Sequence, residues 1–165
     1  LSLISKIKKP KQILEIGTFT GYSALSLAEG LKKGGEIHTI DKNEELLQIQ
    51  NKYFKKSNYR DNIFQYTMDA SIMLGKMNKK FDIIFLDADK KNYVNYLNYI
   101  PNILNINGIL IADNVLWYGK VLGKIAEMDK ETKAIYEFNK KLKNSKQFQS
   151  IILPLRDGIS ISIKL

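Results

Sequence analysis

The stretch "FDIIFLDADK", residues 81–90, is an apolar run that ends in two carboxylates and a lysine. The run is almost entirely apolar before Asp87, as expected of a central parallel strand buried on both faces. Parallel sheets of this kind occur in α/β proteins, whose helices cover both faces of the sheet. The stretch therefore predicts a central strand that carries Asp87 and Asp89 at its carboxyl end.

Strand-like and helix-like segments alternate on both sides of this strand. Further strands are predicted at residues 12–17, 36–41, 62–67 and 108–113, and two more in the tail around an Asp157–Gly158 turn. Helices are predicted at about 22–33, after Asn43, at about 70–77, from about Lys90 and at 129–145. The pattern predicts a single domain over residues 1–165. Its fold class is α/β, a doubly wound, mostly parallel seven-stranded sheet with a C-terminal antiparallel hairpin.

Two helices have more detailed expectations. Leu46, Ile49 and Tyr53 form an apolar stripe that should face the core after the N-cap at Asn43. Pro101 should interrupt the helix that begins near Lys90, because proline has no backbone N–H to donate.

Length and composition exclude several classes of protein. The 165 residues, 44% of them hydrophobic, suit one globular domain that buries about 70% of the surface of its unfolded chain. There is no cysteine, so a disulfide framework and a thiolate metal site are excluded. The sequence contains neither a signal-peptide pattern nor an apolar run near the roughly 20 residues that span a bilayer. We expect a cytoplasmic protein that does not enter a membrane.

The net charge of +9 raises the question of nucleic-acid binding. Only Arg60 and Arg156 among the 26 basic residues are arginines, and the lysines are spread along the chain. Nucleic-acid surfaces more often cluster arginines, whose planar groups grip phosphates. The charge therefore indicates a lysine-rich composition, although it could help to attract an anionic partner.

A glycine-containing loop, "EIGTFTGYS" at residues 15–23, follows the first predicted strand. Its G-x-x-x-G spacing is neither the G-x-G-x-x-G of dinucleotide folds nor a phosphate-binding P-loop. Asp41 ends the second strand, where α/β nucleotide binders accept hydrogen bonds from ribose hydroxyls. With Glu15, this favours an adenosine-bearing ligand other than NAD, and S-adenosylmethionine fits.

Oxygen donors end two of the predicted strands. Asp87 follows one apolar run, and Asp113 and Asn114 follow another, "GILIADN". Two carboxylates and an amide suit a hard divalent cation, with Mg²⁺ as the first expectation. The single histidine, His38, lies within a strand and is interpreted as structural, so a zinc site is not expected.

Lys90 begins the helix that follows the central strand, three residues after Asp87. If the first turn brings it back over the strand end, it lies beside the cation and could act as a general base. Its neighbour Lys91 is expected to remain in solvent.

The sequence resembles the cation-dependent class I O-methyltransferases that include caffeoyl-CoA and catechol O-methyltransferases. The segments that carry the likeness are "LEIGTFTGYSALSLA", "FDIIFLDADKKNYVNY", "NGILIADNVLWYGKV", "FNKKL" and "LPLRDGISISI". They extend over nearly the whole chain, and the "LDADK" and "DNVLWYG" pair is the more specific part. Family members usually carry an additional N-terminal helical segment, which this sequence is expected to lack.

The resemblance implies a role for individual residues. A metal would be held by Asp87, Asp113 and Asn114, Lys90 would be the base, and Trp117 would wall the acceptor pocket. S-adenosylmethionine would contact Glu15, Gly17, Ser23, Asp41, Ala70 and Asp89. A homodimer is compatible with the resemblance.

The expected reaction is methylation of a hydroxyl on a small aromatic diol that chelates the cation. One alternative keeps the chemistry and methylates a hydroxylated uridine in tRNA. A second is an S-adenosylmethionine-binding domain without turnover, for example a truncated one. A nucleotide-linked oxidoreductase is disfavoured by the glycine spacing, and a base N-methyltransferase by the absence of a [DN]-P-P-[FYW] motif.

Overall fold

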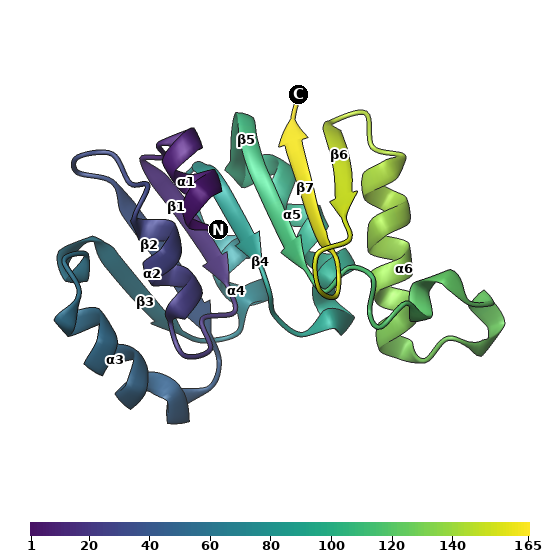
Figure 1. Cartoon of the computed structure of the whole chain (residues 1–165), viewed down its shortest axis with the longest axis horizontal. Helices are drawn as coiled ribbons and strands as arrows, with labels where there is room; N and C mark the ends of the chain where they lie inside the picture. Colours follow the sequence, from purple (N-terminus) through teal and green to yellow (C-terminus); the bar gives the residue numbers. More distant parts are fainter.

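The strands form one seven-stranded sheet in the computed structural model, which describes all 165 residues (Figure 1). Their order across the sheet is β3-β2-β1-β4-β5-β7-β6. The strands are β1 Gln12–Ile16, β2 Glu36–Asp41, β3 Ile63–Thr67, β4 Phe81–Leu86, β5 Leu104–Asp113, β6 Phe148–Leu153 and β7 Ile159–Lys164. The first five run parallel, and β7 pairs antiparallel with both β5 and β6. The predicted fold class is confirmed.

The order of the strands reverses between β1 and β4. The chain moves outward from β1 to β2 and β3, then returns to place β4 on the other side of β1. In open α/β sheets, ligands bind beyond the carboxyl ends of the strands at such a switch point. Ile16 pairs with Leu86 there, and the Asp87 N–H donates to the Ile16 carbonyl at 2.9 Å.

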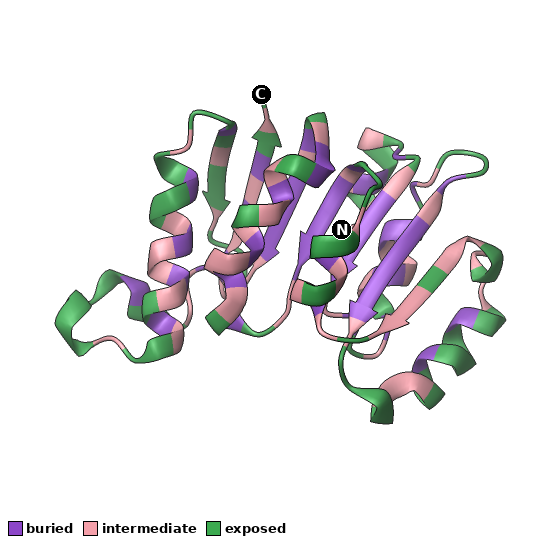
Figure 2. Ribbon diagram, turned by 180° about the vertical axis from the view of Figure 1, so that it is seen from behind, coloured by how far each residue is buried: buried purple, intermediate pink, exposed green.

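Helices cover both faces of the sheet, and each set closes one apolar core. On one face lie α1 Ser2–Lys8, α2 Tyr22–Ala28 and α3 Leu47–Lys56; on the other lie α4 Ala70–Lys76, α5 Tyr93–Ile103 and α6 Lys130–Lys143. Short 3-10 helices lie at Glu44–Leu46, Arg60–Asn62, Lys90–Asn92, Lys120–Leu122 and Ile125–Glu127. The larger core joins the sheet to α4, α5 and α6, and the smaller one joins it to α2 and α3. β1 and β4 lie between them and are almost wholly buried (Figure 2).

The helix after Asn43 does not bury the expected stripe. Asn43 caps it as predicted, accepting a hydrogen bond from the Glu45 N–H. However, Ile49 and Tyr53 are exposed, while Gln50 and Phe54 are buried. Contacts with the glycine loop determine this orientation, because the Gln50 amide donates to the Phe19 carbonyl at 2.6 Å.

Two other helix ends differ from the prediction. Helix α2 ends at Ala28 instead of about Lys33. Gly30 follows it and packs against α1, where a Cβ would lie only 2.1 Å from the Ser5 carbonyl carbon. Helix α5 continues through Pro101 to Ile103. Pro101 lies in its last turn, where the helix loses only one hydrogen bond to the missing N–H.

The hairpin turn is shifted by one residue from the predicted Asp157–Gly158 centre. The Gly158 N–H donates to the Leu155 carbonyl at 3.0 Å, which places Arg156 and Asp157 at the centre of the turn.

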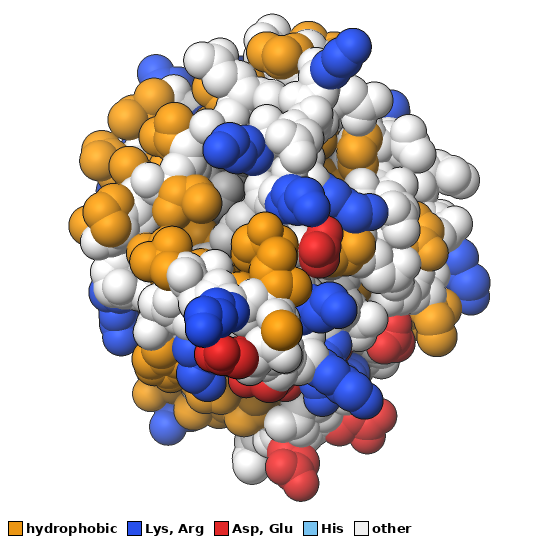
Figure 3. Space-filling model, turned by 90° about the vertical axis from the view of Figure 1, so that its right-hand side faces the viewer, with side chains coloured by type: hydrophobic (Ala, Val, Ile, Leu, Met, Phe, Trp, Pro, Cys, Tyr) orange, Lys and Arg blue, Asp and Glu red, His pale blue; other side chains and the backbone are white.

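No helix in the structure is long and apolar enough to cross a membrane. The face at the α6 end carries Lys and Arg side chains that are separated by hydrophobic and uncharged ones (Figure 3).

Candidate active site

The glycine loop packs against the end of the central strand. Gly17 has φ +102°, and a Cβ built there would lie 2.0 Å from the Asp87 carbonyl oxygen. The Gly17 N–H also donates to the Ile40 carbonyl at 2.9 Å, which ties the loop to β2. The close approach at Gly17 is made by the Asp87 backbone. Glycine is therefore required here because β1, β2 and β4 end close together.

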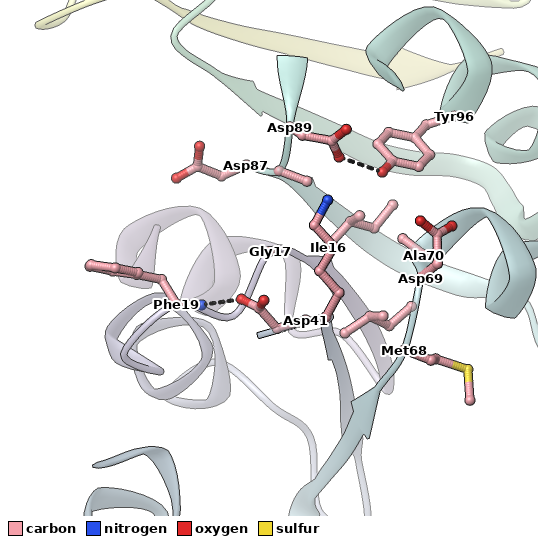
Figure 4. A pocket seen from close by; sticks show the side chains of 13 residues that line it. Ile16, Gly17, Phe19, Asp41, Met68, Asp69, Ala70, Asp87, Asp89 and Tyr96 are labelled. Carbon is pink, nitrogen blue, oxygen red and sulfur yellow. Dashed lines mark hydrogen bonds between the residues drawn. The ribbon is translucent and has the colours of Figure 1, made fainter. Parts of the chain in front are cut away.

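A cavity of about 370 Å³ lies beyond the carboxyl ends of β1 to β4 (Figure 4). Its lining comprises Ile16, Gly17, Phe19, Ile40, Asp41, Lys42, Met68, Asp69, Ala70, Asp87, Ala88, Asp89 and Tyr96. Four of the residues predicted to bind S-adenosylmethionine line this cavity: Gly17, Asp41, Ala70 and Asp89. We call it the donor cavity, after the methyl donor that these residues are predicted to bind. The other two, Glu15 and Ser23, are not part of the lining.

Backbone groups hold Asp41 in place at the end of β2. The Phe19 N–H donates to its Oδ2 at 2.8 Å, and the Asn43 N–H donates to its Oδ1 at 2.9 Å. Each carboxylate oxygen keeps a second lone pair that could accept a hydrogen bond from a hydroxyl group.

Asp89 is held by two side chains of the following helical turns. The Tyr96 hydroxyl donates to its Oδ1 at 2.9 Å, and the Asn92 amide donates to its Oδ2 at 2.5 Å. Tyr96 thus reaches the donor cavity from α5, as Figure 4 shows.

The sequence prediction missed Phe19, Met68, Asp69 and Tyr96 in this lining. Asp69 had a readable signal, because it follows β3 much as Asp41 ends β2, and it caps α4 through the Ser71 N–H at 2.8 Å. Tyr96 had none, since only the packing of α5 brings it to the strand ends.

Glu15 lies beneath the glycine loop and is completely buried. The Thr39 hydroxyl donates to its Oε2 at 2.5 Å and lies 2.5 Å from the Thr18 hydroxyl, while Oε1 has no hydrogen-bond partner. Burial raises the pKa of Glu15 to about 8, although the Ser23 and Thr39 hydroxyls partly oppose the rise. The Glu15 carboxyl is therefore neutral near pH 7.

A second cavity, of about 600 Å³, adjoins the first. Its lining comprises Asp87, Asp113, Asn114, Leu116, Tyr118, Gly119, Leu122, Arg156 and Asp157. The three predicted metal ligands thus share one cavity, and Asp87 lines both. Trp117, predicted to wall the acceptor pocket, is not in this lining and packs against the larger core instead. Its neighbour Tyr118 lines the cavity.

Lys90 is only 8% exposed and lines neither cavity. Its Nζ donates to Asp87 Oδ1 at 2.9 Å and to the Tyr93 hydroxyl at 2.6 Å. The Tyr93 hydroxyl lies 3.2 Å from the Leu86 carbonyl and 3.1 Å from the Asp113 carbonyl, so it bridges β4 and β5. Lys91, by contrast, points into solvent, where its Nζ is 3.7 Å from Glu131.

Asp87, Asp113 and Asn114 are chemically suited to a divalent cation. Burial raises the pKa of Asp113, and the negative charge of Asp87 adds to the rise against the Asn114 N–H hydrogen bond. Asp87 and Asp113 each accept a hydrogen bond within the chain at Oδ1, and Oδ2 of each remains available. A cation would relieve the repulsion between these carboxylates, so the set fits an oxygen-ligated ion. No three His, Cys, Asp or Glu side chains are grouped to hold a metal, so the Asn114 amide would be needed.

His38 is a packing residue, as predicted. It is buried, its ring stacks on Phe64, and its Nδ1 lies 2.9 Å from the Tyr66 hydroxyl. Burial lowers its pKa, so it is neutral near pH 7.

Comparison with known proteins identifies related sequences and structures. The family described as O-methyltransferase matches residues 1–165. The chain is 32% identical to a caffeoyl-CoA O-methyltransferase of Populus kitakamiensis, covering 100% of this chain and 74% of that protein. It is 31% identical to a flavonoid 3',5'-methyltransferase of Vitis vinifera, covering 100% of this chain and 75% of that protein.

A solved O-methyltransferase from Bacillus cereus, in complex with S-adenosylhomocysteine, superposes with a TM-score of 0.92. The two chains are 26% identical, and the match covers 99% of this chain and 78% of that one.

Proposed function

This chain belongs to the class I S-adenosylmethionine-dependent O-methyltransferase family, and we propose that it methylates a hydroxyl of a catechol-like small molecule with the aid of a divalent cation. The observation that carries the proposal is the position of Asp87, which lines both cavities. A methyl donor in one cavity and an acceptor in the other would meet at this residue. Relatives named for caffeoyl-CoA and flavonoid substrates support a phenolic acceptor.

The donor cavity suits a cationic ligand. Four carboxylates line it, those of Asp41, Asp69, Asp87 and Asp89, against one lysine. The sulfonium group of S-adenosylmethionine is positively charged, so this lining would attract it. Asp41 would accept hydrogen bonds from the ribose, while Gly17, Ala70 and Asp89 contact the rest of the molecule. Glu15 and Ser23 would act from beneath the loop by holding its shape.

The second cavity would receive the acceptor. Asp87, Asp113 and Asn114 would hold a divalent cation, Mg²⁺ by its preference for oxygen ligands. Bound there, the cation would lower the pKa of the hydroxyl to be methylated.

Lys90 would remove the hydroxyl proton. Lys90 lines neither cavity, but its Nζ is held by Tyr93 against Asp87, which lines both, and its unprotonated amine would accept the proton. S-adenosylmethionine would supply the methyl group on its sulfonium sulfur, and transfer to the acceptor oxygen would release S-adenosylhomocysteine. The chain contributes mainly alignment and charge, because the sulfonium is already reactive.

Replacing Asp87 with Ala tests this proposal. We expect loss of magnesium-dependent methylation of a 3,4-dihydroxyphenyl substrate and weaker Mg²⁺ binding by calorimetry, while circular dichroism shows an intact fold. Asp61→Ala is the matched control, because that exposed carboxylate interacts only with Arg60. Unchanged activity of Asp87→Ala, or full activity in a chelator, would contradict the metal role.

A binding domain without turnover remains the main competing function. Calorimetric titration with S-adenosylmethionine, beside an assay on the same catechol, separates the two. Binding of S-adenosylmethionine without methyl transfer to any catechol would favour the competing function.

A further inference from the structure

The second cavity contains one basic side chain among several acidic ones. Asp87, Asp113 and Asp157 supply carboxylates to its lining, and Arg156 supplies the only positive charge. No hydrogen bond or ion pair within the chain involves the Arg156 guanidinium. Arg60, the other arginine, pairs with Asp61 instead.

The backbone at Arg156 is held in an unfavourable conformation. Its φ is +52°, at the first central position of the turn that joins β6 to β7. Turns with a positive φ at that position are dominated by Gly, Asn and Asp, and a residue with a Cβ is strained there. The turn would form more readily with glycine, so folding of the hairpin does not explain an arginine at this position.

The turn is fixed against the loop that carries the predicted metal ligands. The Val115 N–H donates to the Gly158 carbonyl at 3.0 Å, and the Leu116 N–H donates to the Asp157 carbonyl at 2.9 Å. Asp157 Oδ1 also accepts from the Tyr118 N–H at 2.5 Å, which adds a third contact between the turn and this loop. The backbone of Arg156 therefore has a defined place at the cavity while its guanidinium remains free to meet a ligand.

The charges in the cavity indicate where that ligand group would lie. Arg156 lines the same cavity as Asp87, Asp113 and Asn114, and it enters the lining from the turn that joins β6 to β7. A cavity of this volume has room for a single aromatic ring with a substituent.

We propose that Arg156 selects acceptors in which the catechol ring carries an acidic group, such as a carboxylate. The two ring hydroxyls would face Asp87, Asp113 and Asn114, and the acidic substituent would meet the guanidinium. This inference rests on the proposed function and narrows its substrate class. Arg156 is exposed, and an exposed charge pair gives a modest preference, about two- to fivefold over a neutral substituent of the same shape.

Two matched probes test the inference: 3,4-dihydroxybenzoate and its neutral analogue 3,4-dihydroxybenzamide. Their affinities are measured by calorimetry in the presence of S-adenosylhomocysteine and Mg²⁺. The unmodified protein should bind the acid about two- to fivefold more tightly than the amide. Arg156→Gly and Arg156→Gln should bind both equally, and glycine suits the positive φ, so the fold is kept. Arg60→Gln is the control, because it removes the same charge elsewhere and should keep the preference.

Equal binding of the two probes by the unmodified protein, or a preference that persists in Arg156→Gly, would overturn the inference. Failure of both probes to bind would overturn it as well. The methylation rates of the same probes, measured in parallel with S-adenosylmethionine, test the proposed function separately. A binding preference without turnover would support the role of Arg156 and contradict the proposed methyltransferase activity. Turnover without a binding preference would support that activity and contradict the role of Arg156.

Discussion

At the scale of single residues, the site depends on polar groups that burial forces into defined partnerships. Glu15 and Tyr93 are both fully buried, and each has a pKa raised by removal from water. Neither lines a cavity, so each would act through the residues that it holds in place.

Glu15 should make the stability of the fold depend on pH. Its pKa is about 8 in the folded chain and near its ordinary value of 4.5 in the unfolded one. As pH rises from about 4.5 to 8, the unfolded chain loses this proton while the folded chain retains it, so stability falls across that window. The loss should reach a few kcal/mol.

Urea unfolding of the unmodified protein and of Glu15→Gln at pH 5 and pH 8.5 checks this expectation. The variant should lose much less stability between the two pH values. Parallel losses in the two proteins would contradict a raised pKa at Glu15.

Tyr93→Phe should impair turnover more than donor binding. The hydroxyl accepts a hydrogen bond from Lys90 and lies within donating reach of the Leu86 and Asp113 carbonyls. Its loss should cost about 1–3 kcal/mol of stability, since buried carbonyls lose a donor. Misplacement of Lys90 should lower kcat by roughly tenfold to a hundredfold. KM for S-adenosylmethionine should stay unchanged, because Tyr93 is outside the donor cavity.

Steady-state kinetics with each substrate varied in turn measures this split. Tyr99→Phe, on the same helix α5, is the control, because its hydroxyl makes no hydrogen bond within the chain. A fall in kcat as large in Tyr99→Phe would show that Tyr93 has no special positioning role.

At the scale of elements, the site is a junction of strand ends and the loops that follow them. The glycine loop crosses the end of β4 so closely that only glycine fits at residue 17. Helix α3 then secures the same loop through Gln50 and Phe54, while Ile49 and Tyr53 are exposed. Local hydrophobic periodicity predicted the helix correctly and its buried face wrongly, because the face was chosen by a loop distant in sequence.

Gly17→Ala and Gly34→Ala form a matched pair that isolates this contact. Both glycines have positive φ, but a Cβ on Gly34 would meet nothing within 4 Å. Gly34→Ala should cost about 1 kcal/mol from backbone strain alone. Gly17→Ala should cost about 3 kcal/mol or more, since the Asp87 carbonyl must move, and it should also weaken S-adenosylmethionine binding.

Chemical denaturation and calorimetry of the two variants measure these effects. Equal destabilisation by the two substitutions would show that the Asp87 carbonyl can move aside at little cost in free energy.

At the scale of the whole molecule, the fold brings two cavities to one edge of the sheet. The donor cavity and the second cavity share Asp87. The net charge of +9 is also a property of the whole molecule. On the face at the α6 end, the Lys and Arg side chains are spread out (Figure 3).

Transfer RNA should bind this protein weakly and without becoming methylated. Dispersed lysines attract phosphates without fixing the position of a base, so binding should fall steeply as salt rises. A filter-binding series across salt concentrations, beside methyl incorporation from labelled S-adenosylmethionine, checks both parts. Methyl incorporation into tRNA with none into catechols would favour the nucleic-acid alternative.

The sequence by itself determined the order and type of the strands and the acids at their ends. Apolar runs such as residues 81–86 and strand-end acids such as Asp41, Asp87 and Asp113 are local patterns, since side chains follow the period of their own strand. The sequence also predicted that Asp87, Asp113 and Asn114 share one site, because parallel strands end at the same edge of the sheet.

Only the tertiary structure decided which neighbours these residues have. It placed Glu15 beneath the loop, Tyr96 in the donor cavity, and Tyr118 with Arg156 in the second cavity, whereas Trp117 packs on the core. These placements depend on how helices rotate and how a hairpin docks on a distant loop. Such contacts join residues far apart in the chain, and no pattern within a single segment records them.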